Sequence, residues 1–371
     1  MENLLIDDAC MRALLPKLEV LAEHLTSAAN TGKTFGIRYH NDCDGICAGL
    51  SIYRALRAIS NEPPIVSIPS PSAVYRQEDA SYELGRFPEP KNTIMLILDH
   101  GANPESVESL RMLKSTGMEI IVIDHHPHDQ RVEKIAKYFI TPLLAGGESS
   151  HTVGLICYEL SRLMDERSSD AALAHFSLQA DKSAFALKGK ELKEPVAIDY
   201  LATLEERPLL FYDKALKSKD FMDESYLQAR EKLDCALKNS EGHIETRDFG
   251  LYSVAVVKIS KFLKKGEYPP RGKIMNEIIA KKERELGGKA LICLGVIDDS
   301  ISFRANKPVM EMGFDANRII SHLKRVFGSE ILNGGGHAPA AALQANASAI
   351  PLIEKEIIAR IALELGEKNR K

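Results

Sequence analysis

The chain of 371 residues lacks several features that mark specialised protein classes. No run approaches the roughly 20 apolar residues of a membrane-spanning helix, and the chain does not open on a basic segment followed by an apolar stretch. The six cysteines are scattered and form no pair of Cys-x-x-Cys elements, which excludes a zinc site of that type. We therefore expect a cytoplasmic protein with reduced thiols and no membrane association.

The chain also lacks an excess of positive charge. Its 48 basic residues are outnumbered by 52 acidic residues, which gives a formal net charge of −4. A polyanionic partner must then be attracted locally or through bound metal ions. One local candidate is the run 258–273, where basic side chains alternate with Phe262 and Tyr268; a solvated loop is the alternative. The basic residues of this run are Lys258, Lys261, Lys264, Lys265, Arg271 and Lys273.

The composition is that of a folded globular protein, because 44% of the residues are hydrophobic and 27% are charged. The length exceeds what one hydrophobic core usually serves, so we expect two domains. The pattern of elements places the first domain at 1–187, a charged helical connector at 188–245 and the second domain at 246–371.

Short apolar runs at 34–39, 93–98 and 119–123 predict three strands, and helical spacing follows each run. Alternating strands and helices predict an α/β fold whose first domain is doubly wound around a parallel sheet. The second domain is predicted to be a smaller α/β domain, with strands at 251–259, 291–297 and 301–305, a glycine-rich loop and a final helix from Pro351. Ligands of such sheets bind outside the carboxyl ends of the strands.

Acidic and histidine side chains follow each of the three strands. In the first of these segments His40, Asp42 and Asp44 alternate, so they point the same way if the chain stays extended. Carboxylates mixed with imidazoles suit Mn²⁺ or Mg²⁺, and there are enough of them to hold two ions with one shared carboxylate. The other candidates are Asp99, Asp124, His125, His126 and, at the end of a helical stretch, Asp181.

Each cluster alone has a structural alternative. Asp-x-Asp-Gly is a common turn sequence, an Asp after a strand often caps a helix, and paired histidines are frequently on the surface. The presence of all these clusters at the ends of successive strands favours a metal site.

The motifs resemble those of the DHH phosphoesterases. Asp124, His125 and His126 after an apolar strand resemble the family signature, and His40-x-Asp42-x-Asp44-Gly45 resembles its first motif in a RecJ-like, archaeal-type form. Asp99 and Asp181 stand where the second and fourth motifs place an Asp, although His100, Gln179 and Ala180 beside them are not the residues most expected there.

This resemblance implies a centre of two Mn²⁺ ions, with Mg²⁺ as the alternative metal. One ion would be held by His40, Asp42 and Asp99. The other would be held by Asp44, Asp99, His125 and Asp181, so that Asp99 bridges the pair. His126 would face the scissile phosphate and act with Asp99 in catalysis.

The C-terminal part also resembles the family, in the glycine motif of its substrate-binding domain. Gly334, Gly335 and Gly336 allow backbone N–H groups to approach a phosphate closely, and His337 adds a donor; a flexible turn is the alternative. Arg304 resembles a phosphate-binding arginine of that domain, and its fork suits bidentate contact. A surface arginine is the alternative for Arg304.

Together these features predict an exonuclease that hydrolyses single-stranded DNA or RNA from an end, with a role in DNA repair and a replication or repair protein as a possible partner. A nano-RNase, a cyclic-dinucleotide phosphodiesterase and a non-catalytic replisome scaffold are the alternatives. A pyrophosphatase of the family is disfavoured, because the glycine motif with His337 is not expected in it.

Overall fold

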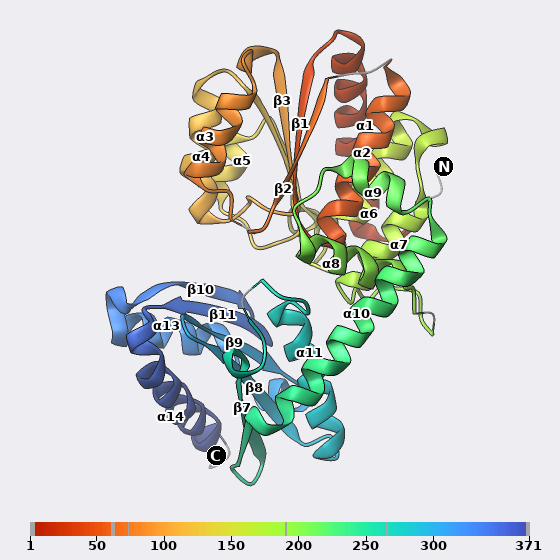
Figure 1. Ribbon diagram of the computed structural model, residues 1–371. Coiled ribbons are helices and arrows are strands. Elements are labelled where there is room, and N and C mark those ends of the chain that lie inside the picture. The colour runs from red at the N-terminus through yellow and green to blue at the C-terminus, as the bar shows by residue number, and fades with distance from the viewer. Residues whose placement is uncertain (1–3, 61–63, 73, 190, 265, 369–371) are drawn as a thin grey trace. The chain divides into compact units, whose positions relative to one another are not determined.

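The computed structural model describes residues 4–60, 64–72, 74–189, 191–264 and 266–368 (Figure 1). The chain forms two compact units, Met1–Leu227 and Gln228–Lys371, and the boundary falls within helix α10 (Lys219–Ser240). None of the helices in these ranges combines the length and the apolar character that a bilayer crossing requires.

A parallel sheet forms the centre of the first unit. Its strands are β1 (Thr34–His40), β2 (Ile65–Ser70), β3 (Thr93–Leu98), β4 (Glu119–Ile123) and β5 (Tyr138–Ile140). They lie in the order β2-β1-β3-β4-β5, a doubly wound order that reverses between β1 and β3. The predicted α/β class is therefore confirmed. The sequence does not reveal β2 and β5, because β2 contains serine and proline and β5 has three residues.

Both faces of this sheet are buried, as expected of a parallel sheet. Leu96 and Leu98 of β3 face one core, whereas Met95 and Ile97 of the same strand face the other. Figure 1 shows one group of helices on each side of the sheet. The first group is α1 (Ala9–Asn30), α2 (Cys43–Ile59) and α6 (Val153–Met164), and the second is α3 (Gln77–Arg86), α4 (Val107–Ser115) and α5 (Gln130–Ile135).

Three further helices continue the first core around α2. They are α7 (Ala171–Ala180), α8 (Glu194–Leu204) and α9 (Leu209–Ala215). Buried residues of these helices, among them Leu178, Ile198 and Tyr212, belong to the same core as the residues of α1 and α2. This packing fixes both ends of α2 in the first unit.

The second unit contains a six-stranded sheet in the order β10-β11-β9-β8-β7-β6, in which only the β7–β8 pair is parallel. Its strands are β6 (Ile244–Asp248), β7 (Tyr252–Lys258), β8 (Ala290–Ile297), β9 (Ser300–Ala305), β10 (Ile331–His337) and β11 (Ala340–Ala345). Helices α13 (Ala316–Phe327) and α14 (Ile350–Lys368) cover its core. The predicted glycine-rich loop is wrong, because residues 334–337 lie in strand β10, which pairs with β11.

Candidate metal centre

Three neighbouring strands of the first sheet end in side chains that can bind a metal ion. His40 is the last residue of β1, Asp99 directly follows β3, and the segment from Asp124 to His126 directly follows β4. These strands are parallel and adjacent, so their carboxyl ends meet where the strand order reverses. Asp99 has a positive φ of 62°, an uncommon conformation for a residue other than glycine and one that concentrates at functional sites.

The start of α2 supplies two more carboxylates. Asp42 is the N-cap residue, and its Oδ1 accepts a hydrogen bond of 3.0 Å from the backbone N–H of Gly45. The chain does not stay extended from His40 to Asp44, because the helix begins at Cys43. Asp44 therefore lies buried in the first helical turn and joins a different group of donor atoms from His40 and Asp42.

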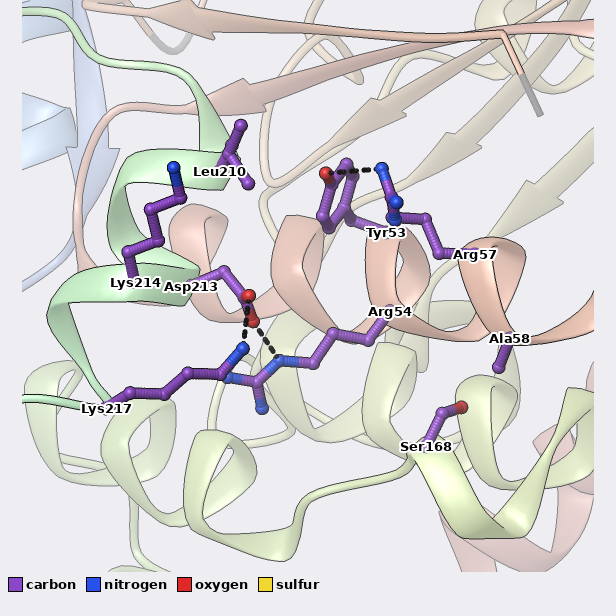
Figure 2. A pocket seen from close by; sticks show the side chains of 9 residues that line it. All are labelled: Tyr53, Arg54, Arg57, Ala58, Ser168, Leu210, Asp213, Lys214 and Lys217. Atoms are coloured by element: carbon purple, nitrogen blue, oxygen red, sulfur yellow. Dashed lines mark hydrogen bonds and ion pairs between the residues drawn. The ribbon is translucent and has the colours of Figure 1, made fainter. Parts of the chain in front are cut away.

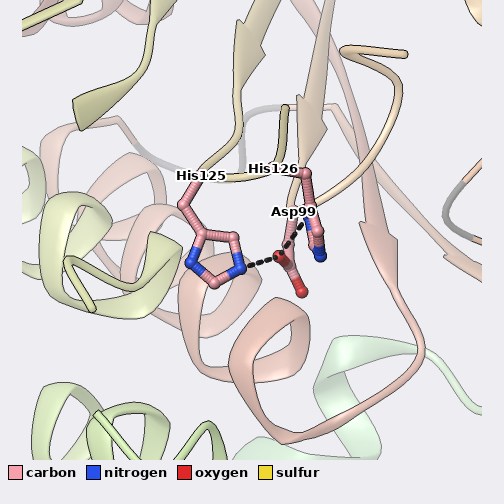
Figure 3. Close-up of side chains that lie close together, drawn as sticks. All are labelled: Asp99, His125 and His126. Atoms are coloured by element: carbon pink, nitrogen blue, oxygen red, sulfur yellow. Dashed lines mark ion pairs between the residues drawn. The ribbon is translucent and has the colours of Figure 1, made fainter. Parts of the chain in front are cut away.

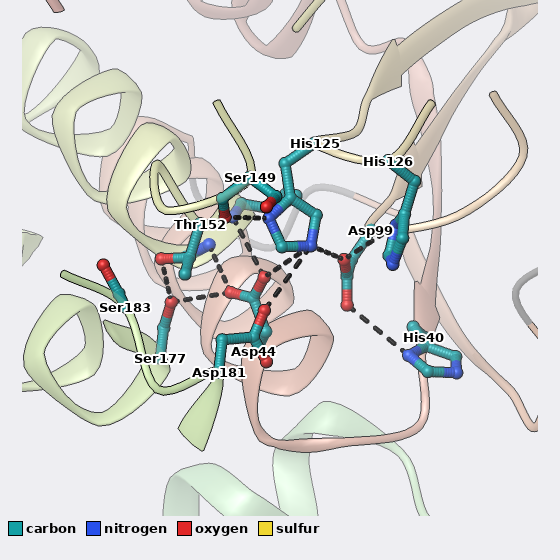
Figure 4. A network of polar contacts seen from close by, with 12 residues as sticks. His40, Asp44, Asp99, His125, His126, Ser149, Thr152, Ser177, Asp181 and Ser183 are labelled. Atoms are coloured by element: carbon teal, nitrogen blue, oxygen red, sulfur yellow. Dashed lines mark hydrogen bonds and ion pairs between the residues drawn. The ribbon is translucent and has the colours of Figure 1, made fainter. Parts of the chain in front are cut away.

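The first group of donor atoms consists of His40, Asp42 and Asp99. His40 Nδ1 lies 2.6 Å from Asp42 Oδ2 and 3.5 Å from Asp99 Oδ2. Figure 4 shows His40 directed at the carboxylate of Asp99. The segment from His40 to Asp42 and the end of strand β3 thus bring one imidazole and two carboxylates close together.

The second group lies on the other side of Asp99 and consists of Asp44, His125 and Asp181. His125 Nε2 lies 3.3 Å from Asp99 Oδ1, 3.5 Å from Asp181 Oδ2 and 3.9 Å from Asp44 Oδ2. Asp99 therefore presents one carboxylate oxygen to each group. A carboxylate placed in this way offers an oxygen on each of its two sides.

The chemistry of the donor atoms suits a hard divalent ion, and hydrogen bonds among these atoms do not satisfy all of them. His40 Nδ1 and Asp99 Oδ1 are buried and, among the described residues, make no hydrogen bond, although carboxylate or imidazole atoms lie close to both. Buried polar atoms normally have hydrogen-bond partners, so these two atoms are suited to bind a metal ion. Oxygen donors with imidazole nitrogens are typical ligands of Mn²⁺, and Mg²⁺ shares the preference for carboxylate oxygen.

The electrostatics of the centre also favour a cation. Burial, together with the charge of Asp99, raises the pKa of Asp44 to about 7. Burial would raise the pKa of Asp99 as well, but the imidazoles of His125 and His40 lower it. Burial would lower the pKa of His125, yet the surrounding carboxylates raise it well above its usual value. Protons on these groups balance the carboxylate charge, and divalent ions would take their place.

The N-terminus of α6 holds Asp44 in place. The backbone N–H groups of Val153 and Gly154 donate to its carboxylate over 3.0 Å and 2.7 Å, and Ser177 Oγ donates over 2.6 Å. Thr152 is the N-cap residue of this helix. The anion at this helix end is thus a side chain of the protein.

Asp99, His125 and His126 also form a group of donor atoms (Figure 3), and two further polar contacts orient the histidines, of which Figure 4 shows the one between His125 and Ser149. His125 Nδ1 lies 2.8 Å from the carbonyl oxygen of Ser149, which directs Nε2 toward Asp99. His126 Nδ1 lies 2.8 Å from Asp124 Oδ1, and Asp124 Oδ2 accepts from the backbone N–H of Ala102. Such outer contacts fix the orientation of ligands in metal sites. Only the order Asp-His-His could have hinted at this role of Asp124, and sequence reasoning missed it.

The candidate phosphate-binding residues lie in the second unit. Arg304 is on β9, where its Nε donates to Asn276 Oδ1 over 2.8 Å. Gly334, Gly335, Gly336 and His337 lie on the edge strand β10. The end of β9 reaches the turn after this motif, since the N–H of Ala305 donates to the carbonyl oxygen of Pro339.

The basic run at 258–273 is only partly available to a ligand. Lys258 pairs with Glu354, Arg271 donates to Ser300, and Lys273 lies over the ring of Tyr268. Lys265 lies outside the described residues.

Comparison with known proteins gives a match to the model of the "DHH family, N-terminal domain" over residues 35–179. The chain is also 24% identical to an uncharacterized protein of Methanocaldococcus jannaschii; the match covers 92% of this chain and 53% of that protein. The chain thus spans about half the length of this curated relative.

Two solved structures share the fold. A DHH domain from a protein described as a member of a family of ribosomal proteins is 21% identical with a TM-score of 0.86, covering 97% of this chain and 93% of that one. An exonuclease RecJ bound to manganese is 17% identical with a TM-score of 0.58, covering 93% and 94%. At these identities the likeness concerns the fold.

Replacing Gly45 by alanine is expected to disrupt the centre. A Cβ at this position would lie 2.2 Å from the backbone oxygen of His40, and backbone cannot move aside cheaply. The segment carrying His40, Asp42 and Asp44 would shift, so we expect Mn²⁺ affinity, measured by calorimetry, to fall at least about tenfold. Gly85→Ala is the matched control, because a Cβ there meets nothing within 4 Å. Equal affinities of the two variants would contradict this account.

Proposed function

Residues 35–179 of this chain match the model of the DHH family's N-terminal domain, and from this premise we propose that the protein is a phosphodiesterase that depends on two Mn²⁺ ions. Mg²⁺ is the alternative metal. The observation that carries the proposal is the position of Asp99, with one carboxylate oxygen directed to each group of donors. A single ion would need only one of these groups.

The ligands would divide around Asp99. His40 and Asp42 would hold one ion, and Asp44, His125 and Asp181 the other. Two ions held in this way would supply Lewis-acid stabilisation of a phosphate and a nucleophilic hydroxide at neutral pH. None of these six positions carries a residue unable to bind a metal, which speaks against a non-catalytic scaffold.

His126 would contact the substrate rather than a metal ion. Asp124 engages its Nδ1, and the His126 side chain is 38% exposed, whereas that of His125 is 5% exposed. The Nε2 atom therefore remains to donate to a phosphate oxygen while Asp124 keeps the ring in the required tautomer and orientation.

We infer that the substrate is single-stranded DNA or RNA digested from an end. Arg304, His337 and the segment of Gly334, Gly335 and Gly336, whose lack of side chains lets a phosphate approach the backbone of an edge strand closely, would bind phosphates of the nucleotide end. Such an activity suits DNA repair and a replication or repair protein as partner. Incubating end-labelled single strands with Mn²⁺ tests this proposal: stepwise shortening of long strands supports it, whereas cleavage of dinucleotides alone would identify a nano-RNase.

Asp99→Asn is expected to reduce Mn²⁺-dependent nucleotide release by more than about 100-fold, because outer contacts of metal ligands alone are worth 10–100-fold. The isosteric amide removes the shared charge with little change in volume. Asp223→Asn, at an exposed carboxylate paired with Lys193, is the control and should retain full activity. Wild-type turnover in Asp99→Asn, with the circular dichroism spectrum unchanged, would refute the two-ion mechanism.

His126→Ala separates substrate contact from metal binding. We expect the variant to bind Mn²⁺ with an affinity within a few-fold of wild type, because Asp124 rather than a metal engages Nδ1. Turnover should fall by about 100-fold or more, in the range of positioned acid–base or donor groups. Calorimetry and single-turnover kinetics measure the two quantities. A parallel loss of Mn²⁺ affinity would make His126 a ligand instead.

A further inference from the structure

A cavity of 690 Å³ lies in the first unit, away from the metal centre (Figure 2). The later turns of α2, helix α9 and the end of the 3-10 helix η4 (Glu166–Ser168) form its walls. Its volume is in the range of sites for small organic ligands. The lining residues are Tyr53, Arg54, Arg57, Ala58, Ser168, Leu210, Asp213, Lys214 and Lys217.

Ion pairs neutralise two of the four basic side chains that line the cavity. Arg54 lies 2.7 Å from Asp213 and 2.9 Å from Asp170, and Lys217 lies 2.8 Å from Asp213. These pairs hold the guanidinium of Arg54 in one orientation between α2 and α9. Two lining cations are neutralised in this way by two carboxylates.

The other two lining cations, Arg57 and Lys214, differ in this respect. Within the described part of the chain, no carboxylate lies within ion-pair distance of either side chain, and both residues are exposed. The Arg57 guanidinium lies 5.8 Å from the ring centroid of Tyr53 and donates to its hydroxyl over 3.4 Å. The cavity therefore presents two uncompensated positive charges, although the whole chain is slightly acidic.

The cavity is too distant to be part of the metal centre. Asp44 and Arg57 are both on α2, thirteen residues apart, which corresponds to about 20 Å at 1.5 Å per residue. A ligand of the cavity would therefore bind independently of the donor atoms around Asp99.

We propose that this cavity binds a nucleoside monophosphate. The planar fork of Arg57 suits bidentate contact with a phosphate, and Lys214 adds a second positive charge. The exposed side chain of Leu210 and, in another part of the lining, Ala58 provide apolar surface for the nucleoside (Figure 2). The ligand is either a free mononucleotide, which is the product class of the proposed reaction, or a nucleotide within a bound strand.

The test uses the whole chain of 371 residues, stripped of divalent metal on a chelating resin and carrying Arg304→Gln to weaken the candidate phosphate site of the second unit. Binding of deoxyadenosine monophosphate is measured by calorimetry. Adding Arg57→Gln and Lys214→Gln should weaken binding at least about tenfold, because two charge-assisted contacts are lost. Both side chains are exposed, so the fold should be unaffected.

Arg86→Gln is the matched control for the arginine. Arg86 also donates to a tyrosine four residues earlier and lies 5.5 Å from the ring centroid of Tyr82, but it does not line the cavity. Its substitution should leave binding unchanged. Equal mononucleotide affinity with and without the Arg57 and Lys214 substitutions would overturn the proposal.

A second arm distinguishes the two sources of the ligand with an uncleavable phosphorothioate strand in the same metal-free protein. If the substitutions weaken binding of both the oligonucleotide and the mononucleotide, a nucleotide of the bound oligonucleotide occupies the cavity. If they weaken binding of the mononucleotide alone, the ligand is a free mononucleotide. Because no metal ion is present, the result is separate from the fate of the proposed hydrolysis.

Discussion

Several carboxylates are buried together at the carboxyl end of one sheet, and the arrangement of the surrounding residues compensates their charge. Asp44 and Asp99 are each about 1% exposed, and two more carboxylates lie within reach of the same histidines. Like charges removed from water destabilise a fold unless partners compensate them. Part of the compensation comes from His40 and His125, and divalent ions would complete it. The reversal of strand order between β1 and β3 is what brings these groups together.

Neighbouring elements of the first unit fix the geometry of the centre. The first N–H groups of α6 bind Asp44, so the partial positive charge of a helix N-terminus faces a buried anion. Ser177 on α7 adds a hydroxyl to the same carboxylate. The Ser149 carbonyl and the Asp124 carboxylate orient the two histidines in a comparable way. The helices that cover the sheet therefore also fix the positions of the charged side chains at its carboxyl end.

Sequence patterns predict the strand ends well and the outer contacts poorly. Apolar runs reveal β1, β3 and β4, and the polar residues after them give His40, Asp99 and the histidine pair. Contacts from α6 and α7 depend on how distant segments pack, which local periodicity does not encode. The glycine motif shows the same limit: its composition favours a loop, yet pairing with β11 makes it a strand, because tertiary hydrogen bonds outweigh local propensity.

Anomalous diffraction from crystals soaked in Mn²⁺ tests the shared-carboxylate centre most directly. Two peaks are expected about 3.5–4 Å apart, with Asp99 bound to both. One peak should lie beside His40 and Asp42, and the other beside Asp44, His125 and Asp181. A single peak, or two peaks of which only one contacts Asp99, would contradict the account.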